Sequence, residues 1–517
     1  MLQQFFYNNI LIKNVFNYSI IKKKYFLIVL SGLLTGLSYN PKISFGWLMW
    51  VSLTPLFRVL LHNDNRNPFL EGYLFGFLHN VVALYWISYN SGVSSSIAFI
   101  SFLVTVFYLS IFWGLFSLLL YRISKKYYFR ALLAPFIIVL IEYARSLGPL
   151  GFPWMNLALT QTKFLNLIQF IDITGSYGLS FLIIISNIVI YNSYKQKKII
   201  YNGILPLLFI IISLIFVGKH KIQLQSSIQN KLKIAIVQPN IDPLNKWKDK
   251  KIVFNTMDSL LLESVKLKPN LILFPETAFP SYLRLDNKLR SYLQNLVDST
   301  NIPILTGTLD ILVDNGTKKY FNSSMWLTPR NKYVMQSKIK LVPFAEYDLF
   351  PKLFWHPLKL LNINLNTGSF YPGSDYIVFR YKKLSFSNLI CYESSFPHMY
   401  YKLLKNKPDF ITIQTNEGWL GNSIGPYQHF EIAKLRAIEN RVFIIRSANT
   451  GISGIINNNG FILDKIALNE KGILFGNISI NKPGSFYSNY GDVFSYFCIL
   501  IFILLYIYQW EKKRLYS

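Results

Sequence analysis

Cysteine is scarce in this chain, which has two among its 517 residues, Cys391 and Cys498. So few cysteines exclude a disulfide-stapled scaffold. Cys498 lies inside the last apolar segment, where we expect its side chain to be packed and unreactive. A disulfide with Cys391 is not expected, because it would have to join the soluble domain to that membrane segment. Cys391 is therefore expected as a free thiol. The six histidines are scattered, so no metal-ligand spacing is present and no metal site is expected.

Charged residues are also few, at 15% of the chain against about 25% in an average soluble protein. Hydrophobic residues make up 52%, which predicts a membrane protein with a soluble part. Acidic residues are the scarcer sign, with 25 Asp and Glu against 53 Lys and Arg and a formal net charge of +28. Nucleic-acid binding is one interpretation of such a charge. The basic residues are dispersed between apolar segments, however, so no nucleic-acid partner is expected.

Long apolar runs are what this sequence has in abundance. A bilayer-spanning helix needs about 20 apolar residues. Eight runs approach that length, near 25–40, 44–61, 68–88, 96–120, 131–147, 165–192, 199–217 and 492–510. The sequence thus predicts a membrane domain of seven helices (1–221), a soluble domain (222–488), and a last transmembrane helix with a short tail (489–517).

The basic residues outside these runs predict the orientation, because cytoplasmic loops are enriched in Lys and Arg. The N-terminal tail, alternate loops and the tail after the eighth run are rich in them, as in Lys22–Lys24, Arg122–Arg130 and Lys512–Arg514. Both termini are then cytoplasmic. The soluble domain follows seven spans and faces outward, and the first span is expected to remain as an uncleaved anchor.

Several polar residues within the apolar runs are not explained by spanning alone. Glu71, His79 and Asn80 lie in the third run, and Glu142 and Arg145 lie near the end of the fifth. Ionisable groups at membrane depth are costly and often functional. An ion pair at the membrane interface is the other interpretation, and the sequence does not separate the two.

The soluble part alternates short β-branched runs with helical patterns. KIAIVQPNI, LILFPET and DFITIQTNE read as strands, whereas 250–266, 287–298 and QHFEIAKLRAIEN have helical periodicity. This mixture predicts an α/β or α+β domain.

Three segments of this part each end an apolar run with a reactive side chain. They are LILFPETAFP with Glu276, QSKIKLVPFAEY with Lys338 and SNLICYESSFP with Cys391. A thiol becomes a nucleophile when a base removes its proton, a carboxylate can carry that proton, and an ammonium can stabilise an oxyanion. Taken alone, a glutamate after a strand is usually a solvated strand end, a lysine usually lies on the surface, and a buried cysteine usually belongs to the core. Together they predict a nucleophilic centre.

The local context of the three residues resembles a known family. FPETAFP, K-x-x-LVPFAEY and ICYESSFP are similar to the catalytic segments of the nitrilase superfamily, which has a four-layer α-β-β-α fold and a Glu-Lys-Cys triad. Within it, the chain resembles the apolipoprotein N-acyltransferase family, whose members are integral membrane proteins. Further segments resemble blocks of that family in both predicted domains, namely GYLFGF, ALYWIS, GFPWMNLALTQ, VQPNIDPLNKW, YFNSSMWL and TNEGWLGNSIGPYQHFEIAKLRAIENRVFIIRSANTG.

The resemblance implies roles for individual residues. Glu276 matches the general base, Lys338 the triad lysine and Cys391 the nucleophile, with no diffusible cofactor needed. Other positions match residues near the family's active site, as supporting groups or in substrate placement and loop closure, and these are Glu346, Glu393, Tyr392, Asn322, Trp247, Trp419 and Trp154. Packing is the alternative for the aromatic ones. The chain departs from the family at Ala345, where glycine is usual, and at Glu417, where aspartate is usual.

The implied reaction is a two-step acyl transfer at the outer face of a bacterial cytoplasmic membrane. The donor is a phospholipid, the acceptor is a diacylated apolipoprotein, and nothing in the sequence demands more than a monomer. Three alternatives stay open: a membrane-tethered amidase, a catalytically silent scaffold and a transporter. The family-like blocks in the membrane part disfavour the first, the intact triad disfavours the second, and the lack of a clear internal repeat disfavours the third.

Overall fold

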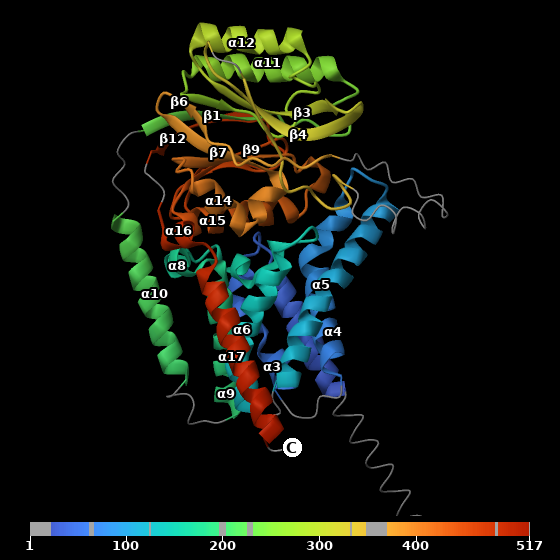
Figure 1. Cartoon of the computed structure of the whole chain (residues 1–517), viewed down its shortest axis with the longest axis vertical. Coiled ribbons are helices and arrows are strands. Elements are labelled where there is room, and N and C mark those ends of the chain that lie inside the picture. Colours follow the sequence, from blue (N-terminus) through green and yellow to red (C-terminus); the bar gives the residue numbers. More distant parts are fainter. Residues whose placement is uncertain are drawn as a thin grey trace, which may run out of the picture.

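The computed structural model describes residues 22–61, 67–123, 126–195, 203–224, 231–330, 333–347, 370–480 and 484–515. Figure 1 shows a bundle of long helices below and a stack of two sheets flanked by helices above. The bundle comes from the described residues up to 224 together with the last helix of the chain. This confirms the expected combination of a helical domain with an α/β sandwich.

Five helices of the bundle are long and apolar enough to cross a membrane, over Ser95–Ile123 in α5, Tyr127–Arg145 in α6, Ser176–Ser193 in α9, Leu205–Leu224 in α10 and Val493–Lys512 in α17. The other three predicted spans are also helical but shorter or broken. A 17-residue helix covers 22–38, and α4 runs over Pro68–Leu84 and continues into the 3-10 turn η2 (Tyr85–Tyr89). The run 44–61 forms η1 (Phe45–Leu48), α2 (Met49–Ser52) and α3 (Thr54–Leu60).

The predicted span 165–192 is divided, which corrects the sequence interpretation. It forms α7 (Leu165–Ile168) and α8 (Ile171–Thr174) before α9 (Ser176–Lys195) begins. The break is at Gly175, whose φ of 65° suits glycine, and a Cβ there would lie 2.5 Å from the ring of Tyr487. Glycine thus lets Tyr487 pack against the start of α9.

The upper part is a sandwich of two six-stranded sheets. The first has the order β12-β1-β2-β3-β4-β5 and the second β11-β10-β9-β8-β7-β6. The bounds are β1 Lys231–Gln238, β2 Leu271–Leu273, β3 Ile304–Asp314, β4 Thr317–Leu327, β5 Val334–Ser337, β6 Phe379–Tyr381, β7 Leu384–Ile390, β8 Phe410–Thr415, β9 Phe443–Ala448, β10 Ser453–Ile456, β11 Ile462–Ile466 and β12 Gly472–Ser479. Their facing sides bury one apolar core, which includes Ile234, Leu273, Phe386 and Ile445. Burial of such side chains stabilises each by about 1.5–3 kcal/mol.

Helices cover both outer faces of the sandwich and complete four layers (Figure 1). The helices α11 (Lys250–Lys266) and α12 (Asn287–Thr300) lie on the first sheet, away from the bundle. The helices α14 (Pro397–Leu404) and α15 (Gly425–Asn440) lie between the second sheet and the bundle, followed by α16 (Phe486–Tyr490).

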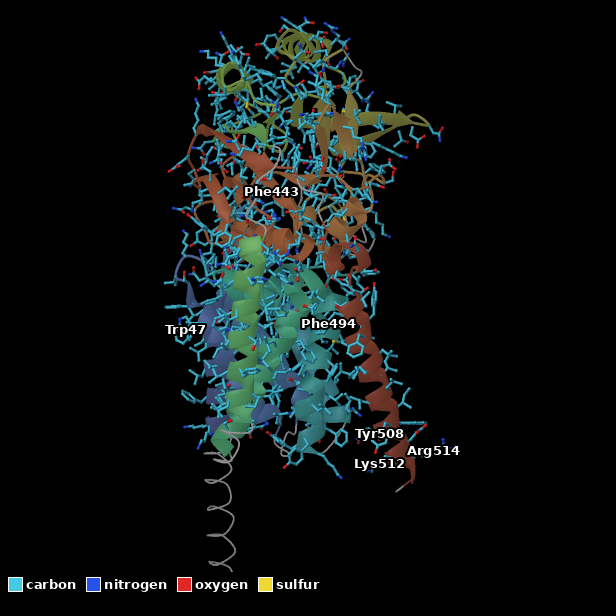
Figure 2. All side chains as sticks on the ribbon, turned by 90° about the vertical axis from the view of Figure 1, so that its left-hand side faces the viewer. Trp47, Phe443, Phe494, Tyr508, Lys512 and Arg514 are labelled. Atoms are coloured by element: carbon cyan, nitrogen blue, oxygen red, sulfur yellow. The ribbon has the colours of Figure 1, made fainter. Side chains whose placement is uncertain are left out.

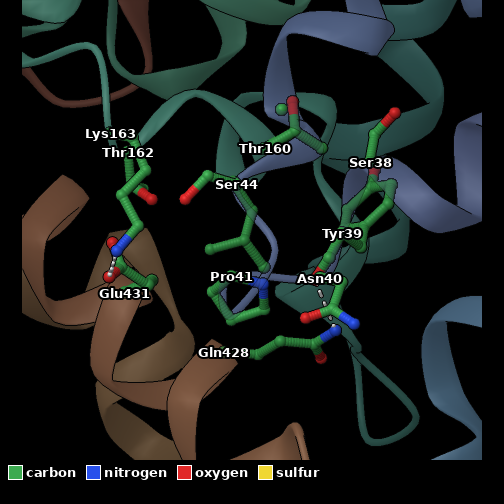
Figure 3. A pocket seen from close by; sticks show the side chains of 12 residues that line it. Ser38, Tyr39, Asn40, Pro41, Ser44, Thr160, Thr162, Lys163, Gln428 and Glu431 are labelled. Atoms are coloured by element: carbon green, nitrogen blue, oxygen red, sulfur yellow. Dashed lines mark hydrogen bonds and ion pairs between the residues drawn. The ribbon is translucent and has the colours of Figure 1, made fainter.

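The helix α15 is polar in sequence but buried over almost its whole length, because the membrane part covers its outer side. Gln428 donates to the carbonyl of Tyr39 at 3.0 Å, and Glu431 lies 3.5 Å from the Lys163 ammonium. Figure 3 shows these residues around a cavity of about 20 Å³, which has room for about one water molecule. The two parts of the chain are therefore in close polar contact.

The last helix, α17 (Val493–Leu515), runs away from the sandwich. In Figure 2, Phe443 lies in the sandwich, Phe494 lies near the top of α17, and Lys512 and Arg514 lie at its far end. The basic end of this helix is thus on the side opposite the α/β domain.

Candidate active site

The three predicted reactive residues each follow a strand. Glu276 lies three residues after β2, Lys338 directly after β5, and Cys391 directly after β7. The strands β7 and β8 are parallel neighbours with Ile390 opposite Gln414, so Cys391 and Thr415 emerge side by side at one sheet edge. The Gln414 side chain donates to the carbonyl of Phe274 at 2.6 Å, which joins this edge to the strand end that carries Glu276.

Glu276 is held by hydrogen bonds to both of its carboxylate oxygens. Asn322 on β4 donates to Oε1 at 2.7 Å, and the backbone N–H of Asn416 donates to Oε2 at 2.8 Å. The Lys338 Nζ is 3.6 Å from Oε1. The carboxylate is therefore fixed in position between both sheets and beside the lysine.

Lys338 is buried and has two carboxylate neighbours. Its Nζ donates to Glu346 at 2.7 Å, and Asn322 bridges Glu346 and Glu276. Burial opposes the charged amine, but Glu346 and Glu276 outweigh it and raise the pKa of Lys338 above its ordinary value. The lysine is thus a permanent cation in the site.

Cys391 has a backbone φ of 54°, a left-handed value that is rare for a residue with a side chain and costs about 1–3 kcal/mol. The hydroxyl of Thr415 donates to its Sγ at 3.3 Å. Glu393 helps to hold the turn, because its carboxylate accepts from the N–H of Ile390 at 2.8 Å and of Lys340 at 2.9 Å. The strained turn is thereby fixed to the lysine loop.

The electrostatics of the site keep the resting thiol protonated. Burial, and then the charge of Glu276, raise the pKa of Cys391 to about 12, while Lys338 opposes the rise. Burial also raises the pKa of Glu276 above its ordinary value, against the effect of Lys338. A raised carboxyl pKa next to a protonated thiol suits proton transfer between the two.

The remaining predicted residues fall into two groups. Tyr392 and Trp154 are buried at the contact with the membrane part, where the Tyr392 hydroxyl donates to the carbonyl of Gly151 at 2.7 Å. The carbonyl of Trp419 accepts from the N–H of Ser91 at 2.8 Å, between α4 and α5. Trp247 is 40% exposed and its ring lies 6.3 Å from that of Tyr282, away from these contacts. Three of the four aromatic residues therefore join the site to the bundle.

The polar pair Glu142 and Arg145 supports the same contact. Glu142 accepts from the N–H of Leu157 at 2.7 Å, and Arg145 donates to the side chain of Asn156 at 3.0 Å. Both residues thus hold the loop that contains Gly151, which explains their burial at the end of α6.

The structure places two further residues near Cys391 and Glu276 that the sequence did not predict, Thr415 and Lys246. Thr415 contacts the thiol, and Lys246 is a buried amine without a hydrogen-bond partner in the described part of the chain. Burial lowers the pKa of Lys246 to about 8, although Glu276 raises it. Lys246 precedes the predicted Trp247 in the chain, and the position of Thr415 at a strand end is the sequence signal for that residue.

Alanine at position 345, where the family usually has glycine, does not strain the backbone. The residue with a positive φ in this loop is Phe344, at 61°, and not Ala345. The N–H of Glu346 still donates to the carbonyl of Val342 at 2.9 Å, and the Glu346 carboxylate accepts from the N–H of Val342 at 2.8 Å. The loop is therefore closed on itself with alanine in place.

Known families match both parts of the chain. Residues 31–189 match the apolipoprotein N-acyltransferase N-terminal domain, and residues 233–486 match carbon-nitrogen hydrolase. An apolipoprotein N-acyltransferase of Geobacter metallireducens is 31% identical over 92% of this chain and 94% of its own length. That of Rickettsia typhi is 32% identical over 92% of this chain and 96% of its own length.

Among solved structures, the chain is similar to XC1258 from Xanthomonas campestris, a CN-hydrolase superfamily protein. The identity is 18% and the TM-score 0.37, over 48% of this chain and 91% of that one. Two findings decide the assignment: the relatives match over nearly their whole length, and the two family matches follow each other along one chain. The chain belongs to the apolipoprotein N-acyltransferase family and is a multi-pass membrane protein with a carbon–nitrogen hydrolase domain.

Proposed function

We propose that this protein transfers a fatty acyl chain from a membrane phospholipid to the α-amino group of the N-terminal S-diacylglyceryl-cysteine of apolipoproteins, through a thioester on Cys391. The observation that carries the proposal is the cluster of a thiol, a carboxylate and a buried ammonium at the sheet edge. Glu276 and Lys338 both act electrostatically on Cys391. The family relationship supplies the choice of substrates.

In the first half-reaction, the Cys391 sulfur attacks the carbonyl carbon of the sn-1 ester, which we take to be that of phosphatidylethanolamine. The thiol proton passes to Glu276 as the sulfur–carbon bond forms, in keeping with a thiol that is protonated at rest. The Lys338 ammonium and the Tyr392 N–H stabilise the oxyanion. The ester carbon–oxygen bond then breaks, the leaving oxygen takes the proton from Glu276, and a lysophospholipid departs.

In the second half-reaction, the acceptor amine attacks the thioester carbonyl. Glu276 takes a proton from the attacking nitrogen, the carbon–sulfur bond breaks, and the sulfur recovers a proton from Glu276. The product is an amide, and the thiol is restored. Water has to be kept from the thioester, because hydrolysis would release a free fatty acid instead.

The contacts between the site and the bundle support lipid substrates. Tyr392, the residue after the nucleophile, is hydrogen-bonded to Gly151 of the membrane part. A cavity of about 250 Å³ lies between the end of α6, the start of α17 and α14, and its lining includes Lys340, Lys402 and Asp492. Two lysines beside the ends of apolar helices suit the phosphate of a phospholipid headgroup.

The topology that fits this reaction has eight spans, both termini in the cytoplasm and the catalytic domain on the periplasmic side of the inner membrane. The far end of α17, with Lys512 and Arg514, is then cytoplasmic. In spheroplasts of a variant without native cysteines, a membrane-impermeant maleimide should label Asn315→Cys, whereas Lys512→Cys should react only after lysis. The reverse labelling pattern would refute this orientation.

Intact mass spectrometry of the purified protein in phospholipid micelles tests the chemistry. The wild type should gain the mass of an acyl chain that hydroxylamine removes, and Cys391→Ala should gain none. Addition of a diacylated lipopeptide should discharge the adduct and yield a triacylated peptide. Fatty-acid release without peptide acylation would indicate a hydrolase, and neither adduct nor fatty acid would indicate a silent scaffold.

A further inference from the structure

A buried chain of polar side chains leads from the sandwich core to the nucleophile, and the proposed reaction does not use it. Arg446 on β9 donates to the Glu417 carboxylate, which lies 2.6 Å from Nδ1 of His429 on α15. The His429 Nε2 is 2.7 Å from the Ser394 hydroxyl, which donates to the carbonyl of Cys391 at 2.7 Å. All four side chains are at most 3% exposed.

The chemistry of the groups assigns the direction of these hydrogen bonds. A carbonyl oxygen only accepts, so the single hydroxyl hydrogen of Ser394 is committed to Cys391. The Ser394 oxygen then accepts from the N–H at His429 Nε2. The Glu417 carboxylate also only accepts and lies 2.6 Å from Nδ1, so the two contacts of the ring favour an N–H at each nitrogen. Burial and the charge of Arg446, whose Nη2 lies 3.1 Å from Nδ1, act against this charge and lower the pKa of His429. The hydrogen bonds thus lead from Glu417 through His429 and Ser394 to the Cys391 carbonyl.

The carbonyl at the end of the chain belongs to the same peptide group as the Tyr392 N–H, which serves as an oxyanion donor in the proposed function. A hydrogen bond to an amide oxygen polarises the amide and strengthens its N–H as a donor. It also fixes the plane of a peptide whose cysteine has the strained φ of 54°. The Ser394 contact thus acts on the direction and on the strength of the oxyanion donor.

We propose that His429 is a positioning residue for the acyl transfer, acting through Ser394 on the Cys391–Tyr392 peptide and held in turn by Glu417. This inference rests on the proposed acyl-transfer function. It gives Glu417 a role, since its carboxylate reaches both His429 and Arg446. No contact of His429 with substrate is required.

The same helix ties this peptide to the membrane part. The His429 ring is 4.9 Å from that of Trp154, and the adjacent Gln428 accepts from the indole N–H groups of Trp154 at 2.9 Å and Trp86 at 3.0 Å. Gln428 also donates to the carbonyls of Tyr39 and Ala83. The position of His429 is therefore set by the bundle as well as by the sandwich.

The chain offers a matched control in the same turn. Ser395 is as buried as Ser394, and its hydroxyl also donates to the carbonyl three residues earlier at 2.7 Å, but this carbonyl is that of Tyr392. Ser395→Ala therefore removes an equivalent hydrogen bond from the neighbouring peptide. Only Ser394→Ala acts on the peptide that carries the oxyanion donor.

The test measures two rates at Cys391 in the full-length protein in phospholipid micelles. The first is the rate of thioester formation, followed by intact mass spectrometry. The second is the rate of alkylation by iodoacetamide, a displacement that forms no oxyanion. We expect Ser394→Ala and His429→Leu to slow thioester formation about tenfold, less than the roughly 10²–10³-fold cost of deleting an oxyanion donor. Alkylation should stay within about twofold, and Ser394→Thr and Ser395→Ala should acylate at near the wild-type rate.

Three results would overturn the proposal. Equal acylation by Ser394→Ala and Ser395→Ala would show that the target carbonyl does not matter. A parallel loss of alkylation would show a general collapse of the turn. A double variant Ser394→Ala/His429→Leu that is clearly slower than Ser394→Ala would show that His429 does not act through Ser394. Failure of the proposed function itself is distinguishable, because the wild type would then form no thioester.

Discussion

Glu276→Gln should make this protein a poorer acyltransferase and yet a faster target for alkylation. Glutamine cannot accept the thiol proton, and loss of a general base costs about 10²–10⁴ in rate, or about 3–5 kcal/mol of transition-state free energy. Burial, and then the charge of Glu276, raise the pKa of Cys391 to about 12, so removal of that charge lowers the pKa. At a fixed pH below 12, more thiolate is then present, and iodoacetamide reacts with the thiolate.

The structure indicates that the fold tolerates this change. Lys338 keeps its nearer partner, Glu346, at 2.7 Å. The glutamine amide has to face either the Asn322 amide or the Asn416 N–H, both of which donate to Glu276, and one mismatched donor costs about 1–3 kcal/mol. The site should therefore remain assembled, with a modest loss of thermal stability.

The assay compares thioester formation and iodoacetamide alkylation of Cys391 by intact mass spectrometry at several pH values. Glu263→Gln, at an exposed position on α11, is the control and should match the wild type in both rates. Thioester formation by Glu276→Gln within about threefold of the wild type would refute the role of general base. Slower alkylation by the variant would refute the electrostatic coupling between the carboxylate and the thiol.

Three further changes test the surroundings of the triad. Burial raises the pKa of Glu393 to about 7. Thioester formation should therefore slow as the pH drops through 7, because the carboxylate loses its charge. In Glu393→Gln this decrease at low pH should be absent. Because this folded-state pKa exceeds the unfolded value of 4.5, the contribution of Glu393 to stability should grow as pH falls from about 7 to 4.5, as thermal unfolding at several pH values can show. Tyr392→Phe leaves the Gly151 carbonyl without this donor and should cost about 1–3 kcal/mol, measured by denaturant unfolding. Gln428→Leu removes four hydrogen bonds to the membrane part and should lower the unfolding free energy by at least about 2 kcal/mol.

Each of these has a contradicting outcome. An acid limb that Glu393→Gln leaves unmoved would assign the titration to another group, such as Glu276. Tyr392→Phe or Gln428→Leu with wild-type stability would mean that the sandwich and the bundle do not depend on these contacts. Ser299→Ala, which removes an exposed hydroxyl from α12, is the control for stability.

The sequence by itself determined that the chain is a membrane protein with an α/β domain. Hydropathy is a property of contiguous residues, and a run such as Leu205–Leu224 is long and apolar enough to span a membrane whatever surrounds it. Five of the eight predicted spans are confirmed as long apolar helices, and the other three stay predictions because their helices are shorter or broken. Family-like segments placed Glu276, Lys338 and Cys391 at strand ends, and their catalytic roles stay predictions.

Only the tertiary structure decided how these residues are held. The partners of the site come from distant parts of the chain, as with Asn416 and Glu276, 140 positions apart, and Gln428 and Tyr39, 389 positions apart. No local pattern records such pairs, because a hydrogen bond depends on where two elements meet and not on their own periodicity. Three features arise where the sandwich docks on the bundle. They are the burial of the polar helix α15, the break at Gly175 and the hydrogen bond between His429 and Ser394.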